Sequence, residues 1–186
     1  MRELELGGLK VRLVGGEDRA GGGDGPLVVP FHGFGAPGTD LVALHRVMDV
    51  TRRTRYAFPE APNDLGPAYG HGRAWWLLDA AKLQQAMMTG VPRDLRDEDP
   101  EALGPLRDQV TEMLDGLTAE LGPSHLVLGG FSQGAMLATE MALSTERTIG
   151  GLVLWSGAYL AGRRWTAAVP GRVADLPVYQ SHGNMD

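Results

Sequence analysis

The pentapeptide GFSQG at positions 130–134 is the part of this sequence whose residue types and spacing best suit covalent chemistry. It fits the pattern G-x-S-x-G, in which a tight turn between a strand and a helix lifts a serine hydroxyl above the edge of a sheet. An apolar run typical of a buried strand precedes it at 126–128, and a helix-forming run follows it at 133–144. A side chain at position 130 or 134 would collide with that strand or helix. The pattern therefore predicts Ser132 as a nucleophile toward acyl groups.

Such a nucleophile needs hydrogen-bond donors for the negative charge that develops on the attacked carbonyl oxygen. The backbone N–H of Gln133 lies at the start of the predicted helix and is expected to be one donor. The segment HGFG at 32–35 follows an early apolar strand, and the N–H of Phe34 is expected to be the other. Two simpler interpretations stay open. Ser132 could serve only as the N-cap of the helix, and residues 32–35 could form a loop selected for its turn geometry.

The rest of the sequence supplies alternating strand and helix patterns that could hold these residues. The expected strands are a hairpin over 4–13 and runs over 27–31, 55–58, 126–128, 149–155 and 177–180, and the expected helices cover 41–48, 78–88, 100–121 and 133–144. This alternation predicts one α/β domain over residues 1–186, with a mostly parallel central sheet and helices on both faces. Pro30 fits its predicted strand poorly, because a central strand needs that backbone N–H.

Composition and charge narrow the class of protein and partner. A chain of 186 residues, of which 43% are apolar, is long enough for one packed core. The net charge of −6 gives no sign of a basic face for nucleic acid and disfavours anionic membranes. Without cysteine there is no disulfide framework, and no apolar run suits a signal peptide or a membrane span. The sequence predicts a soluble, cytoplasmic protein without a metal ligand set.

Three segments, FHGFG, GGFSQGAM and the terminal QSHGNMD, resemble in the same order the phospholipase/carboxylesterase family, which includes the acyl-protein thioesterases. The resemblance extends from about Val28 to Asp186. It implies an α/β-hydrolase fold and esterase or thioesterase activity on a small-molecule acyl ester or thioester, with no metal or organic cofactor. The family's HG-x-x-D motif places its triad acid at Asp186.

The aromatic segment RAWW at 73–76 is similar to the W-[FY]-D element of the same family, although Leu77 stands where the family often has Asp. The resemblance implies that Trp75 lines the acyl pocket. An equally simple interpretation makes both tryptophans ordinary packing residues, because large aromatic side chains dominate protein cores. Residues 162–170 are a candidate lid, and a homodimer is left open.

The triad order Ser, Asp, His implied by the resemblance requires a histidine after Asp186, which is the last residue. We therefore expect a fold truncated after the acid-bearing strand, lacking a final strand, the histidine loop and a helix. The histidines at 32, 45, 71 and 125 are expected to be structural or solvent-facing. Two functions follow as alternatives: a serine hydrolase acting through a Ser132 acyl-enzyme, and a non-catalytic acyl-binding module that lacks the triad histidine.

Overall fold

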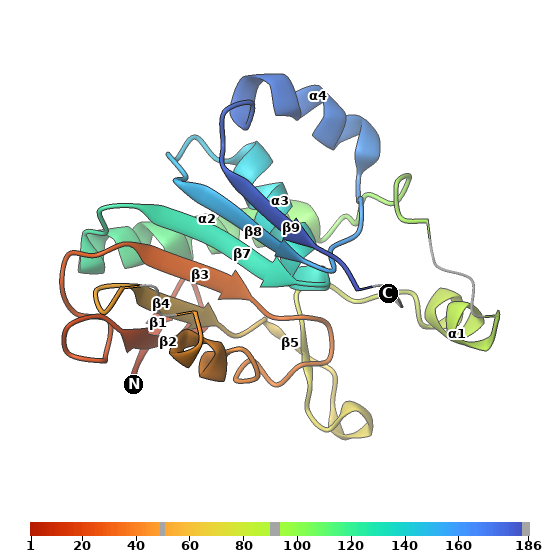
Figure 1. The fold of residues 1–186 in the computed structure, drawn as a ribbon. Helices are drawn as coiled ribbons and strands as arrows, with labels where there is room; N and C mark the ends of the chain where they lie inside the picture. The colour runs from red at the N-terminus through yellow and green to blue at the C-terminus, as the bar shows by residue number, and fades with distance from the viewer. Residues whose placement is uncertain (49–50, 90–93, 184–186) are drawn as a thin grey trace.

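A seven-stranded sheet forms the centre of the molecule in the computed structural model, which describes residues 1–48, 51–89 and 94–183 (Figure 1). Its strands are β1 (Arg2–Leu6), β2 (Leu9–Gly15), β3 (Leu27–Phe31), β4 (Arg55–Pro59), β7 (Leu126–Phe131), β8 (Gly151–Trp155) and β9 (Val178–Ser181). The α-helices are α1 (Ala80–Thr89), α2 (Leu103–Leu121), α3 (Gln133–Ser144) and α4 (Gly162–Arg172). Two short strands, β5 (Asn63–Asp64) and β6 (Arg73–Ala74), pair apart from the main sheet, and η1 (Val42–Arg46) and η2 (Pro67–Tyr69) are 3-10 helices.

The strand order is β1-β2-β4-β3-β7-β8-β9. The two pairs that involve β2 are antiparallel, and the four pairs from β4 to β9 are parallel. This arrangement confirms the expected mostly parallel sheet of an α/β fold. Because the carboxyl ends of parallel strands meet at one edge, the loops after β3, β7 and β8 come together there. Pro30 is accommodated because the pairing of β3 with β4 stops at Val28, two residues earlier.

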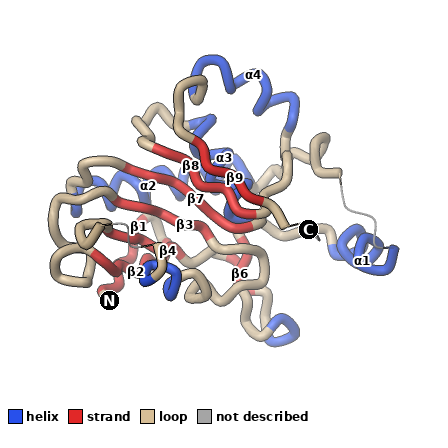
Figure 2. Tube along the Cα trace, in the orientation of Figure 1, coloured by secondary structure: helices blue, strands red, loops and turns tan. Residues whose placement is uncertain are grey.

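One face of the sheet carries most of the core. Helix α3 packs against β3, β7 and β8, and α2 packs against α3 and β1, so both helices lie on that face (Figure 2). The opposite face has a smaller cluster of Val14, Tyr56 and Phe58, and η1 covers it through Val42. The described part of the chain contains no helix with the length and apolarity that crossing a bilayer requires.

Several elements differ from the sequence-based expectation. The prediction of a helix over 41–48 is wrong, because only the 3-10 helix η1 forms there. Its first residue lacks a side-chain cap, and none of its residues is buried, so no packed face stabilises a longer helix. The strands β5 and β6 were not expected in a Pro/Gly-rich segment. Residues 162–170, the candidate lid, belong to helix α4, and their lid function stays a prediction.

Candidate active site

Ser132 occupies the turn between β7 and α3, at the carboxyl edge of the sheet. Its backbone has φ 52° and ψ −114°, a conformation that an L-residue adopts only when its surroundings enforce it. The Ser132 N–H donates to the carbonyl of Trp155 at the end of β8 (2.9 Å), and its own carbonyl accepts from the N–H of Ala135 (3.0 Å). These two bonds tie the strained turn to the neighbouring strand on one side and to the first turn of α3 on the other.

The two flanking glycines have no space for a side chain, as the pattern predicted. A Cβ on Gly130 would lie 2.4 Å from the carbonyl carbon of Gly134, and a Cβ on Gly134 would lie 2.0 Å from the carbonyl oxygen of Phe31. Both distances are far inside van der Waals contact. The turn can therefore form only with glycine at both positions, because there the backbone of α3 packs directly against the backbone of β3 and β7.

The Ser132 hydroxyl does not cap the helix. Although Ser132 is the N-cap residue of α3, its side chain makes no capping hydrogen bond, so the simpler interpretation of this serine is wrong. Among the residues that the structure describes, the hydroxyl has no hydrogen-bond partner, and the side chain is partly exposed. The N-terminal N–H groups of α3, beginning with Gln133, follow directly and add the partial positive charge of a helix start.

The loop at residues 32–35 lies beside this elbow. A Cβ on Gly33 would come within 3.0 Å of the Phe131 ring, and the His32 carbonyl oxygen lies close to Gly134. Nothing in the described part of the chain accepts a hydrogen bond from the Phe34 N–H. The structure thus brings Phe34 and Gln133 to the same end of the sheet as Ser132, and their role as oxyanion donors stays a prediction.

His32 is held in one neutral form by its contacts. Its Nε2 accepts a hydrogen bond from the Ala61 N–H (3.0 Å), so the proton is on Nδ1, which donates to the Gly33 carbonyl (2.8 Å). Burial of the ring lowers the pKa of the His32 imidazole below its ordinary value. With both nitrogens hydrogen-bonded to backbone groups, His32 has a structural role here and offers no free nitrogen to Ser132.

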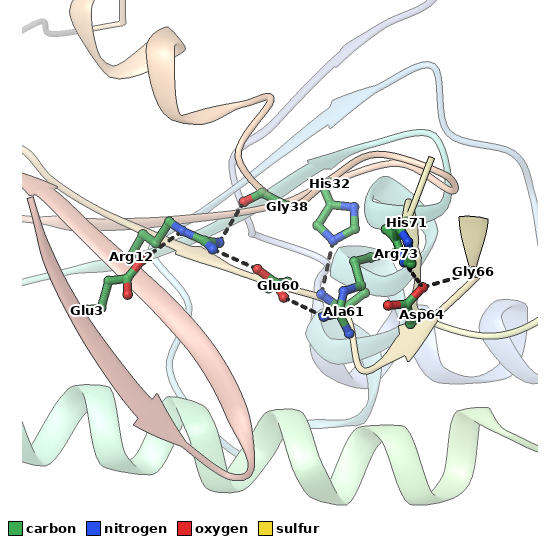
Figure 3. A network of polar contacts seen from close by, with 10 residues as sticks. All are labelled: Glu3, Arg12, His32, Gly38, Glu60, Ala61, Asp64, Gly66, His71 and Arg73. Atoms are coloured by element: carbon green, nitrogen blue, oxygen red, sulfur yellow. Dashed lines mark hydrogen bonds and ion pairs between the residues drawn. The ribbon is translucent and has the colours of Figure 1, made fainter. Parts of the chain in front are cut away.

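A network of charged groups supports the same loop from the other side (Figure 3). The carboxylate of Glu60, which follows β4, pairs with Arg12 of β2 (2.7 Å) and with Arg73 of β6 (3.1 Å). Arg12 also donates to the Gly38 carbonyl at the end of the loop (3.2 Å). Glu60 was not among the residues that the sequence singled out, and Arg73 was noted only as the first residue of the RAWW segment. Nothing in their local pattern marks them, since the three partners are brought together only by the fold.

The remaining predicted residues fall in different places. Trp75 is 1% exposed and packs edge-on against Phe31, with ring centroids 5.3 Å apart, so its observed contacts are those of a packing residue. Its role in an acyl pocket stays a prediction. Asp186 lies outside the described residues. Within the described ranges no histidine is hydrogen-bonded to the Ser132 hydroxyl: His45 bonds to the Val42 carbonyl, and the histidines at 71, 125 and 182 are exposed.

Comparison with known proteins finds relatives named as carboxylesterases and acyl-protein thioesterases. The family model described as "Phospholipase/Carboxylesterase" matches residues 22–186. A protein of Oryza sativa subsp. japonica named "Probable carboxylesterase" is 32% identical over 173 residues, which are 90% of this chain and 69% of that protein. Acyl-protein thioesterase 1 of Kluyveromyces lactis is 26% identical over 171 residues, covering 86% of this chain and 69% of the relative.

Solved structures give the same result for the fold. The crystal structure of esterase PE8 superimposes with a TM-score of 0.74 at 25% identity, covering 95% of this chain and 75% of that one. Zea mays acyl-protein thioesterase 2 superimposes with a TM-score of 0.65 at 19% identity, covering 93% and 75%. Because the family model spans nearly the whole sequence, the chain belongs to the phospholipase/carboxylesterase family of α/β-hydrolases.

Proposed function

We propose that this protein is a carboxylic ester or thioester hydrolase that acts on small-molecule acyl substrates through a Ser132 acyl-enzyme. The observation that supports this most strongly is the conformation of Ser132, a strained residue whose hydroxyl is free of capping and lies at the start of α3. Strained backbone of this kind clusters at functional sites, where the surrounding structure holds it in place. The names of the relatives, carboxylesterase and acyl-protein thioesterase, agree with this reaction class.

The proposed reaction has two steps. The Ser132 oxygen attacks the acyl carbonyl carbon, its proton passes to a base, and the alcohol or thiol leaves with a proton. Water then attacks the acyl-enzyme, releases the carboxylic acid and restores the serine hydroxyl. In both steps the negative carbonyl oxygen would accept hydrogen bonds from the N–H groups of Phe34 and Gln133. No cofactor is required by this scheme.

Asp186 is proposed as the acid of the triad, on the basis of the HGNMD motif alone. A base is needed because a serine hydroxyl is a weak nucleophile at neutral pH. In this scheme the base is an imidazole, as the triad order implied by the resemblance requires. None of the described histidines is hydrogen-bonded to Ser132.

Turnover of p-nitrophenyl butyrate tests the proposal. The wild-type chain should release p-nitrophenol faster than buffer, and Ser132→Ala should abolish that excess. Ser124→Ala removes an exposed serine before β7 and is the matched control, which should keep wild-type rates. Release that is unchanged in Ser132→Ala, or absent from the wild-type chain, contradicts the proposed hydrolase.

A non-catalytic acyl-binding module is the second candidate. Two observations favour it: no described histidine is hydrogen-bonded to Ser132, and an apolar cavity of about 520 Å³ lies between α3, α4, β8 and β9, with Ala135 in its lining. In that case a fatty acid binds without turnover of its ester, and Ser132→Ala leaves the affinity unchanged. Calorimetry with decanoate, in parallel with the p-nitrophenyl butyrate assay, separates the two functions.

A further inference from the structure

The Gln133 side chain links the nucleophile turn to a distant segment of the chain. It is 1% exposed, and both ends of its carboxamide are used. The Oε1 atom accepts from the Trp75 N–H (3.0 Å), and Nε2 donates to the Trp76 carbonyl (2.8 Å). The residue that offers one proposed oxyanion donor through its backbone is therefore fastened through its side chain to residues 75–76.

Trp75 continues this connection to the other proposed donor. Its indole N–H donates to the His32 carbonyl oxygen (2.9 Å), two residues before Phe34. The indole also packs against the rings of Phe31 and His32, with centroids 5.3 and 5.2 Å away. Because a buried indole held by two ring contacts and at its nitrogen has little freedom, it fixes the start of the 32–35 loop relative to residue 75.

The far side of Phe34 is held by the same segment. The Gly35 N–H donates to the Arg73 carbonyl, and the Arg73 N–H donates to the Ala36 carbonyl, both at 2.8 Å. The side chain of Arg73 is in turn paired with Glu60. Residues 73–76 thus contact the loop before and after Phe34 and the carboxamide of Gln133.

We propose that the Gln133 carboxamide and the Trp75 indole N–H are positioning groups that set the spacing between the two oxyanion donors. This inference rests on the proposed hydrolase function. Both donors must lie about 2.7–3.1 Å from one developing oxyanion, so a shift of either loop weakens one of the two hydrogen bonds. The charge on that oxygen is greatest in the transition state, and the effect therefore falls on kcat more than on KM.

Paired tryptophan variants test the indole contact. Trp75→Phe removes the N–H that bonds to His32 and keeps an aromatic ring, and Trp76→Phe removes the same atoms from the adjacent buried residue. The second variant measures the cost of the packing change alone. We expect kcat for p-nitrophenyl butyrate to fall about 10–100-fold further in Trp75→Phe than in Trp76→Phe, the scale expected when a catalytic donor is misplaced. KM should differ between them by less than about threefold.

Gln133 is tested with two variants and a transition-state analogue. Gln133→Met removes both side-chain hydrogen bonds at similar side-chain volume. Gln133→Glu keeps the shape and the acceptor for the Trp75 N–H and replaces the Nε2 donor by oxygen. A trifluoromethyl ketone, which forms a tetrahedral adduct with serine, should bind more weakly in proportion to the loss of kcat/KM. An amide analogue of the substrate should bind nearly as in wild type.

The outcomes separate this inference from the function on which it rests. If the wild-type chain neither hydrolyses the ester nor binds the ketone, the proposed function fails and the inference fails with it. If the wild type is active and Trp75→Phe matches Trp76→Phe in kcat, the function stands and the positioning role is wrong. A loss confined to KM also overturns the positioning role.

Discussion

Gly134 is the residue of the elbow with the least space for a side chain. A Cβ there would lie 2.0 Å from the Phe31 carbonyl oxygen, which is backbone of the central strand β3 and cannot rotate away. We predict that Gly134→Ala lowers the free energy of unfolding by about 3 kcal/mol or more, at the upper end of the cost of overpacking. Urea denaturation followed by circular dichroism measures this change.

Gly104→Ala is the matched control, since Gly104 also lies in an α-helix and its nearest neighbour to a Cβ is 3.9 Å away. There alanine should change the free energy of unfolding by less than about 0.5 kcal/mol, because the position is open and lies in the first turn of the helix. Equal effects of the two substitutions would show that the close approach of α3 to β3 is not what requires glycine at 134.

His32 gives the stability of the fold a dependence on pH. Burial holds its pKa below the ordinary value of 6.5, so the folded state keeps the ring neutral while the unfolded state takes up a proton. The contribution of the neutral ring to the free energy of unfolding is fully present above about pH 6.5. It is lost as the pH falls from there through the lower pKa that His32 has in the folded state. Thermal unfolding from pH 7.5 to 5 should show Tm falling in wild type and falling less in His32→Gln. If Tm fell equally with pH in the two proteins, the pH dependence would not come from His32.

Residues of the elbow could be predicted from the sequence because their requirement is local. Small residues at 130 and 134 and a serine between them describe one turn, and the structure confirms both steric limits. Glu60 and the side-chain role of Gln133 could not be found that way. Their partners lie up to 58 residues away, and no periodic pattern reports a contact across the fold.

At the scale of elements, a buried carboxylate holds α4 against α3. Glu140 is 0% exposed and accepts hydrogen bonds from Arg107 of α2 (3.2 Å), from Arg164 of α4 (2.5 Å) and from the Trp165 indole (2.6 Å). Removing one partner of a buried ion pair leaves charges without compensation. Since both arginines are 36% exposed, we predict that Glu140→Gln costs about 3 kcal/mol, the low end for such pairs.

Chemical denaturation of Glu140→Gln beside Glu112→Gln checks this value. Glu112 is exposed on α2, and its substitution should change the free energy of unfolding by less than about 0.5 kcal/mol. Hydrogen exchange adds a local readout, because amides of α4 should lose protection before those of α2. A loss of under about 1 kcal/mol in Glu140→Gln would mean that the network contributes little to holding α4.

The longer elements could be predicted from periodicity, and the short ones could not. Helices α2 and α3 bury continuous apolar faces, and the strands that pair in parallel are apolar runs, so each has a signal that covers its length. The 41–48 segment has apolar residues at helical spacing as well, yet none of the residues in η1 is buried. The pairing of β5 with β6 joins two residues of each strand, too few to make a pattern.

At the scale of the whole molecule, β9 is the edge of the sheet in the described part of the chain. Val178 and Tyr179 on this strand are 51% and 61% exposed, and an exposed apolar edge favours pairing between chains. We predict concentration-dependent self-association, which Tyr179→Lys reduces. Val47→Lys is the control, because Val47 is an apolar residue directly after η1 that is 81% exposed. In sedimentation velocity this variant should sediment as wild type. Unchanged association in Tyr179→Lys would exclude the β9 edge as the contact.

The proposed function requires that the fold present Ser132 as a nucleophile. Intact-mass and peptide mass spectrometry after treatment with an activated fluorophosphonate test it directly, with Ser132→Ala and Ser124→Ala in parallel. We predict one adduct, located on the peptide that contains Ser132, in wild type and in Ser124→Ala, and none in Ser132→Ala. An unmodified wild-type chain, or an adduct on one of the other four serines, would contradict the claim.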